Sequence, residues 1–271
     1  MKFINSKKHI NMSVHREKVR MLFLLAKNDI HAKYSGSVFG IVWAFALPLV
    51  TILVFWVVFQ AGFRNPPVRK VPYILWFSAA YIPWTFFTDV TTAGGSCLAE
   101  YSFLVRKIRF QVQLLPVVKL LSALFVHAFF VLFLIVMYFL YDFPPSVYHL
   151  QIIYYAFAAS FLGLGLTWLL SALTVFFKDM ASLYGILLQI GFWASPILWN
   201  ENNLKSRLVS QALSFNPMRY VVNGYRDSLL FQCWFWEKPR QTAQFWCMAL
   251  MIWSMGRVVF RKLSPFFADE V

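Results

Sequence analysis

The stretch VFGIVWAFALPLVTILVFWVVFQAGF, residues 38–63, decides the fold of this chain of 271 residues. No side chain in it carries a charge. About 20 helical residues cross the hydrocarbon layer of a bilayer, and this stretch exceeds that length. A backbone inside that layer satisfies its polar groups only in a helix or a closed barrel, and the stretch is too long for a barrel strand. It therefore predicts a transmembrane α-helix.

Further apolar runs follow along the chain, so the first stretch is not an isolated anchor. Hydrophobic residues make up 60% of the chain and charged residues 13%, which leaves too little polar side chain to cover a soluble domain. We expect an all-α membrane protein with about six transmembrane helices. The further runs are residues 73–92, 120–141, 152–177, 181–199 and 245–260.

The distribution of basic residues predicts which helix ends lie in the cytoplasm. Eight Lys or Arg residues precede the first run, and cytoplasmic segments beside membrane helices carry an excess of these residues. Six crossings then place both termini in the cytoplasm, although Arg64, Arg69 and Lys70 in the first external loop oppose the trend. The net charge of +14 also suits nucleic acid, but basic residues placed between apolar runs are typical of attraction to anionic lipid headgroups. We therefore expect membrane lipids as partners and no nucleic acid.

Residues 1–36 form a basic segment before the first membrane helix. Residues 16–33 can form a helix that groups Arg16, Arg20 and Lys27 and places apolar side chains along another side. A helix of this kind lies in the membrane interface. The alternative is a plain extension of the first membrane helix, because further apolar side chains lie off the stripe. The stripe consists of Val19, Leu22, Phe23, Ala26 and Ile30.

Residues 94–114 predict a cytoplasmic elbow between the second and third membrane helices. Gly94 and Gly95 break the helix, and the apolar and basic sequence FLVRKIRF follows at residues 103–110. A patch of this kind at the membrane surface suits contact with lipid, or contact with a soluble partner that pushes on the membrane helices. The residues alone leave both interpretations open. The basic residues of the elbow are Arg106, Lys107 and Arg109.

Residues 200–243, between the fifth and sixth membrane helices, contain apolar stretches that are too short to span a bilayer. Pro196 and Pro217 supply the backbone breaks that a chain dipping into the membrane requires. We expect re-entrant periplasmic helices here, and a folded external loop is the alternative. The predicted division of the chain is a six-helix transmembrane domain at residues 37–260 and a cytoplasmic tail at residues 261–271.

Aromatic residues make up 20% of the chain, which is more than two interfacial belts ordinarily use. The flat apolar faces and polar edges of Trp and Tyr suit the C–H faces of sugars and let a polymer slide past. For each residue singly, a place in an interfacial belt or against lipid is the alternative. The candidates for a polysaccharide path are Trp43, Trp56, Tyr81, Trp84, Trp193 and Trp199.

The chain offers no recognisable catalytic constellation, so we expect that it is not an enzyme by itself. The three cysteines have no metal-ligand spacing, and no glycine-rich loop ending in Lys-Ser or Lys-Thr is present to bind ATP. Acidic residues are scarce within the apolar runs. We interpret Asp89 as a solvated or Arg-paired carboxylate and His127 as a partner in a hydrogen bond between helices.

Several strings, in order along the chain, resemble the permease subunit of type-2 ABC exporters, in the branch that moves O-antigen, capsular and teichoic acid polymers. The resemblance covers nearly the whole chain from about residue 20 onward. The matching strings are DIHAKYSGSVFGIVW at 29–43 leading to Pro48, FLVRKIRF at 103–110, VFFKD at 175–179, ASPI at 194–197, Asn216-Pro217, and FRKLSPFFADEV at 260–271.

This resemblance implies a homodimer in a bacterial inner membrane, with two separate nucleotide-binding ATPase subunits that carry the ATP and Mg. This chain would bind no cofactor itself. The substrate would be a polysaccharide on a polyprenyl diphosphate lipid. The family often has a proline after the basic pair of the elbow, and this chain has Gln111, Val112 and Gln113 instead. The residues implied to contact the ATPase subunit are Glu100, Arg106, Lys107 and Arg109 of the elbow, with Arg16, Arg20 and Lys27 of the interfacial helix.

Other functions fit the same pattern of helices. A permease of this architecture can export capsule, teichoic acid, a lipid or a drug, and the high aromatic content favours glycan only weakly. A membrane glycosyltransferase or acyltransferase is a further alternative, but it needs an acidic pair or a His with a nearby Asp at the membrane surface. The sugar composition and the length of the polymer are not readable from the residues.

Overall fold

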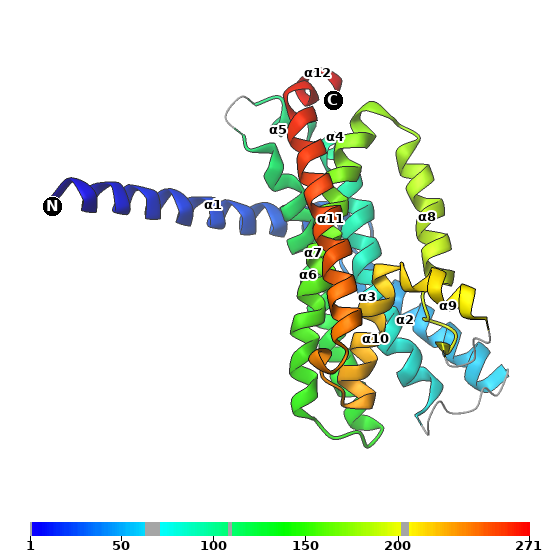
Figure 1. Ribbon diagram of the computed structural model, residues 1–271. Coiled ribbons are helices and arrows are strands. Elements are labelled where there is room, and N and C mark those ends of the chain that lie inside the picture. Colours follow the sequence, from blue (N-terminus) through cyan, green and yellow to red (C-terminus); the bar gives the residue numbers. More distant parts are fainter. Residues whose placement is uncertain (1, 63–70, 108–109, 202–205) are drawn as a thin grey trace.

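The computed structural model describes residues 2–62, 71–107, 110–201 and 206–271, and in these ranges the chain forms helices and no β-strand. Long helices lie side by side in a bundle, and the first helix projects crosswise from its flank (Figure 1). The long elements are α1 (Lys2–Tyr34), α2 (Val42–Trp56) with η1 (Val57–Gly62), α3 (Tyr73–Gly95), α6 (Leu115–Leu140), α7 (Gln151–Phe176), α8 (Met180–Ala194) and α11 (Pro239–Leu263).

Short helices join the long ones. The elbow end of the bundle, where α4, α5 and α12 lie, is at the top of Figure 1, and the opposite end is at the bottom. The short elements are α4 (Cys97–Glu100), α5 (Ser102–Val105), η2 (Val112–Leu114), η3 (Val147–Leu150), α9 (Arg207–Ser214), α10 (Pro217–Arg226), η5 (Asp227–Phe231), η6 (Phe235–Glu237), η7 (Ser264–Phe266) and α12 (Phe267–Glu270).

Helices occupy all the positions at which membrane crossings are predicted, and the all-α membrane fold is confirmed. Among the described residues, four helices are long and apolar enough to cross a bilayer. Two further helices at predicted positions fall short: α8 has 15 residues, about 22 Å, and α3 has 23 residues but a less apolar composition. The four spans are Val42–Phe59, Val112–Leu140, Val147–Phe176 and Pro239–Glu270.

The weaker hydropathy of α3 has a structural reason. Helix α3 packs against α2, α6, α7, α8 and α10, and most of its residues are buried. A helix enclosed by protein does not need the lipid-compatible surface of a peripheral span, so α3 can carry Ser, Thr and Asp side chains. The ring centroid of Phe77 lies 4.9 Å from that of Phe55 on α2, in a tilted arrangement, and 5.1 Å from that of Tyr81 on α3 itself, in a stacked one.

Helices α7 and α11 cross at unusually short range. A Cβ atom on Gly256 would lie 2.0 Å from the carbonyl oxygen of Gly165, and one on Gly165 would lie 2.7 Å from the Cα of Trp253. Small residues permit such close backbone approach between membrane helices, where van der Waals packing drives association. This crossing therefore requires glycine on both helices.

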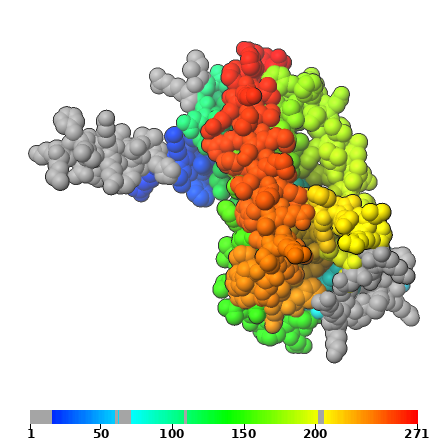
Figure 2. Space-filling view, in the orientation of Figure 1, coloured from blue at the N-terminus to red at the C-terminus, as the bar shows by residue number. Residues whose placement is uncertain are grey.

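The segment between α8 and α11 enters the bundle. Helix α10 is largely buried against α3, α7 and α11, whereas α9 is mainly exposed and forms the yellow ridge in Figure 2. Asn216, which caps the start of α10, donates from its Nδ2 to the Ser195 hydroxyl at 2.8 Å, just after α8. The predicted re-entrant segment therefore contains a helix packed inside the bundle, and its depth in the membrane stays a prediction.

Candidate functional site

The elbow begins where α3 ends, at Gly95, as the glycine pair predicts. A Cβ on Gly94 would lie 2.1 Å from Cγ2 of Thr167, so glycine lets the end of α3 lie directly on α7. The chain then forms two single-turn helices, α4 and α5, which meet at Tyr101.

A second hydrophobic core, separate from that of the main bundle, lies beneath the elbow. It joins the elbow to α6, α7, α11 and α12. The apolar side of the elbow therefore packs into protein, and its outer side carries the exposed residues Phe103, Arg106 and Lys107. The buried members of this core are Cys97, Leu98, Val105, Leu115, Trp168, Ala172, Phe260 and Phe267.

An ion network ties the elbow to α1 and α6. Lys119, in the second turn of α6, places its Nζ 2.7 Å from Oδ1 of Asp29 on α1 and 2.5 Å from Oε2 of Glu100 on α4. The side chains of Lys119 and Asp29 are each only 5% exposed, whereas that of Glu100 is 47% exposed. The Tyr101 hydroxyl donates to Asp29 at 2.7 Å, and the Ser96 hydroxyl donates to Glu100.

Helix α1 docks through a narrow face. Ala26 and Asp29 are its buried residues among those with described side chains, and the Ser122 hydroxyl of α6 donates to the Ala26 carbonyl at 3.1 Å. Val19 and Phe23 of the predicted stripe are exposed at 40% and 63%. The predicted helix at residues 16–33 is confirmed, and its outer apolar side chains are free to contact lipid.

Local electrostatics keep these groups in the forms that bind one another. Burial raises the pKa of Tyr101, as do its hydrogen bond to Asp29 and the charge of that carboxylate, so the phenol stays protonated and donates. Burial by itself would lower the pKa of Lys33, but the Asp89 carboxylate 2.5 Å away outweighs it and the pKa is raised. Asp89 is therefore paired, as expected, although with a lysine and not with an arginine.

The predicted coupling residues fall into separate places. Glu100 belongs to the ion network, and Arg106, also exposed, donates from its Nε to the backbone oxygen of Val271 at 3.1 Å. The Lys107 ammonium lies 6.0 Å from the ring centroid of Phe103. Arg16, Arg20 and Lys27 are exposed on α1, and no described contact joins them to the elbow. Arg109 lies outside the described residues.

The residues that hold this site together, Asp29 and Lys119, were not among the sequence candidates. A usable signal existed, because Lys119 follows Leu115 in a helix that is otherwise uncharged from there to Leu140. An ionisable residue in an apolar helix requires a partner. Starting the third run at residue 120 left this lysine out of the predicted helix.

The aromatic candidates do not form one group in the described structure. Trp84 is buried and its ring centroid lies 5.9 Å from that of Phe192 on α8. The indole of Trp199 donates to the Trp193 carbonyl at 2.9 Å. The remaining candidates lie elsewhere: Trp43 and Trp56 are 40% and 38% exposed on α2, and Tyr81 is half-buried on α3. Their role along a polysaccharide path stays a prediction.

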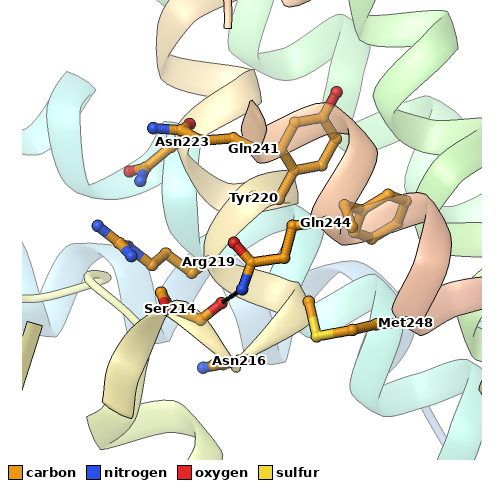
Figure 3. A pocket seen from close by; sticks show the side chains of 9 residues that line it. Ser214, Asn216, Arg219, Tyr220, Asn223, Gln241, Gln244 and Met248 are labelled. Atoms are coloured by element: carbon orange, nitrogen blue, oxygen red, sulfur yellow. Dashed lines mark hydrogen bonds between the residues drawn. The ribbon is translucent and has the colours of Figure 1, made fainter. Parts of the chain in front are cut away.

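A polar region lies around α10, away from the elbow. Figure 3 shows the polar side chains of α9, α10 and α11 gathered at a small pocket, where Gln244 donates to the Ser214 carbonyl at 3.0 Å. A larger cavity of about 440 Å³ adjoins the end of α10 and is lined in part by Trp76, Glu201 and Arg226.

Buried polar groups of α10 find partners on other segments of the chain. The Arg226 guanidinium donates to the carbonyls of Trp76, Pro196 and Ile197 and stacks 3.4 Å from the ring centroid of Trp76. His127 Nε2 lies 2.6 Å from the Tyr225 hydroxyl, which confirms the predicted hydrogen bond between helices. These contacts fix α10 to α3 and α6.

The described residues contain no group of three or more His, Cys, Asp or Glu side chains arranged to hold a metal ion. Several bilayer-length helices define a multi-pass membrane protein. A family model for the ABC-2 type transporter matches residues 20–230. The chain belongs to the ABC-2 type transporter family.

Curated relatives extend the similarity to 92% of the chain. The O-antigen export system permease protein RfbA of Myxococcus xanthus is 25% identical over 207 residues, 76% of this chain and 78% of that protein. A protein of the same name from Klebsiella pneumoniae is 21% identical over 250 residues, 92% of this chain and 94% of that protein. A second Klebsiella pneumoniae protein of that name is 20% identical over 252 residues.

Proposed function

We propose that this chain is the transmembrane permease subunit of an ATP-driven exporter that moves an O-antigen-type polysaccharide, carried on polyprenyl diphosphate, across a bacterial inner membrane. The observation that carries the proposal is the similarity to O-antigen export permeases over 92% of the chain. Such low identity supports a shared architecture more strongly than a shared cargo, so the cargo needs its own test.

The proposed assembly contains two copies of this chain and two nucleotide-binding subunits, which supply ATP and Mg²⁺. Two copies related by a two-fold axis could enclose one path, whereas the helices of one copy leave little room for a hydrated polymer. Both termini and the elbow would face the cytoplasm, in keeping with the positive-inside distribution of Lys and Arg. The exposed Arg106 and Lys107 then meet the ATPase subunit.

Deletion of the gene in its host, with analysis of the glycans of the cell surface and the cytoplasm, tests the proposed function. We expect loss of surface polymer and accumulation of lipid-linked polymer inside the cell. Unchanged surface glycan in the deletion strain would refute the polysaccharide assignment.

Complementation of that strain with Arg106→Ala/Lys107→Ala tests the elbow. We expect this variant, expressed at the wild-type level, to restore at most about a tenth of the surface polymer, since loss of two charged contacts weakens an interface by roughly tenfold or more. The matched control is Arg261→Ala/Lys262→Ala, an exposed basic pair at the same end of the bundle. Full restoration by both variants would rule out the elbow as an essential contact.

A further inference from the structure

The ammonium of Lys119 joins three structural elements that share no other ion pair within the described structure. It lies between a carboxylate of the side helix α1 and a carboxylate of the elbow, and it belongs to α6, which runs the length of the bundle. Helix α1 packs mainly on α6, and its one described hydrogen bond to the elbow runs from Tyr101 to Asp29. Lys119 therefore sits at the point where these elements meet.

Both ion pairs of this junction depend on the single cation of Lys119. Asp29 and Glu100 share one cation, so removal of the ammonium would leave two carboxylates facing each other, with that of Asp29 buried and that of Glu100 half exposed. Uncompensated buried charge is strongly unfavourable. Without Lys119 the two acidic side chains repel each other, and of the described polar contacts between the elbow and α1 the Tyr101–Asp29 hydrogen bond remains.

The two ion pairs of Lys119 differ in exposure. Asp29 is as buried as Lys119 and also accepts from Tyr101, whereas the Glu100 side chain is about half exposed. Water can replace the partner of an exposed carboxylate far more easily than that of a buried one. The Lys119–Asp29 ion pair is thus the more constrained of the two, and the Lys119–Glu100 ion pair is the one that breaks more easily.

We propose that Lys119 is the positioning residue that couples the elbow to α1, so that a displacement of the elbow moves α1 and the first turns of α6 as one unit. This inference rests on the proposed function, because it assigns the displacement to the ATPase subunit. Lys119 touches neither ATP nor substrate. It acts by holding Glu100 and Asp29 together while force passes through the elbow.

The test uses the complex of this chain with its ATPase subunit in proteoliposomes, and it measures polymer export per ATP hydrolysed. We expect Lys119→Met to lower that ratio about fivefold or more, with ATP hydrolysis retained, since allosteric coupling of this kind is worth at least that factor. Glu100→Gln breaks only the exposed Lys119–Glu100 ion pair and should also lower the ratio. Lys119→Arg keeps the charge and should retain the coupling. Lys262→Met removes an exposed lysine at the elbow end of the bundle and should leave the ratio unchanged.

The outcomes separate this inference from the proposed function. A wild-type complex that exports polymer, with Lys119→Met at an unchanged ratio or Lys119→Arg as defective as Lys119→Met, would overturn the inference and leave the function intact. Absence of ATP-dependent export in the wild type would refute the function. If Lys119→Met does not fold, the Glu100→Gln ratio decides.

A distance measurement tests the junction without transport. Spin labels at the exposed positions Arg20 of α1 and Phe103 of α5 report the separation of the two elements. We expect a narrow distribution of distances in the wild type and a broad one in Glu100→Gln and Lys119→Met. Equal widths in all three would contradict the inference.

Discussion

At the residue scale, the most constrained cation of the described structure is Arg226. Its side chain is buried, and its donors satisfy three backbone carbonyls contributed by two other segments. Arginine suits this role because its planar guanidinium presents several N–H groups in fixed directions. This side chain joins the segment after α8 and the start of α3 to α10, in addition to the Asn216–Ser195 hydrogen bond.

Replacement of Arg226 by methionine should therefore destabilise the protein, because it leaves buried carbonyl oxygens without donors. We expect a loss of roughly 2–4 kcal/mol, or about 5–10 °C in apparent Tm in detergent. Arg240→Met, at an exposed position at the start of α11, is the matched control and should leave the Tm within about 2 °C of wild type. Equal Tm values for the two variants would show that the carbonyl contacts of Arg226 add no net stability.

At the element scale, the crossing of α7 and α11 depends on the absence of side chains. We expect Gly256→Ala to push the helices apart, since its Cβ would overlap the Gly165 carbonyl oxygen, at a cost of about 2 kcal/mol or more. Gly185→Ala is the matched control, because a Cβ there, within α8, meets no atom within 4 Å. That control should be neutral or stabilising by up to about 1 kcal/mol. Thermal unfolding of both variants in detergent measures the difference, and a Gly256→Ala variant as stable as Gly185→Ala would contradict the crossing.

The sequence could predict the elements far better than their contacts. Long uncharged runs locate α2, α6 and α7 because the requirement for lipid-compatible surface acts on every residue of a peripheral span. The same requirement is relaxed for α3, which protein encloses, so its composition understates its place in the fold. Glycines and prolines located the elbow and the breaks around α10, since their effect on the backbone is local.

The ion network of the elbow could not be read in the same way. Asp29 and Lys119 are 90 residues apart, and their pairing depends on how α1 crosses α6, which no local pattern encodes. The pairing of Lys33 with Asp89, which are 56 residues apart, likewise depends on helix packing and not on a local pattern. A charge near an apolar run predicts that a partner exists, but only the packing of the helices decides which residue it is.

At the scale of the whole molecule, the distribution of apolar surface is what an assembled membrane subunit requires. Helices α2 and α8 expose large apolar side chains along much of their length, including Leu47, Val50, Ile186 and Ile190. Lipid or a second copy of the chain can cover these faces, as the proposed dimer requires. The exposed basic residues of the elbow lie at one end of the same bundle.

We propose that this chain moves a lipid-linked polysaccharide across the membrane when an ATPase subunit drives it. The most direct test follows labelled polymer in inverted membrane vesicles that contain the chain and its ATPase subunit, with vesicles lacking the chain as the control. We predict that added ATP makes the polymer resistant to a glycosidase outside the vesicles, only when this chain is present. Polymer that stays fully digestible with ATP would contradict the claim.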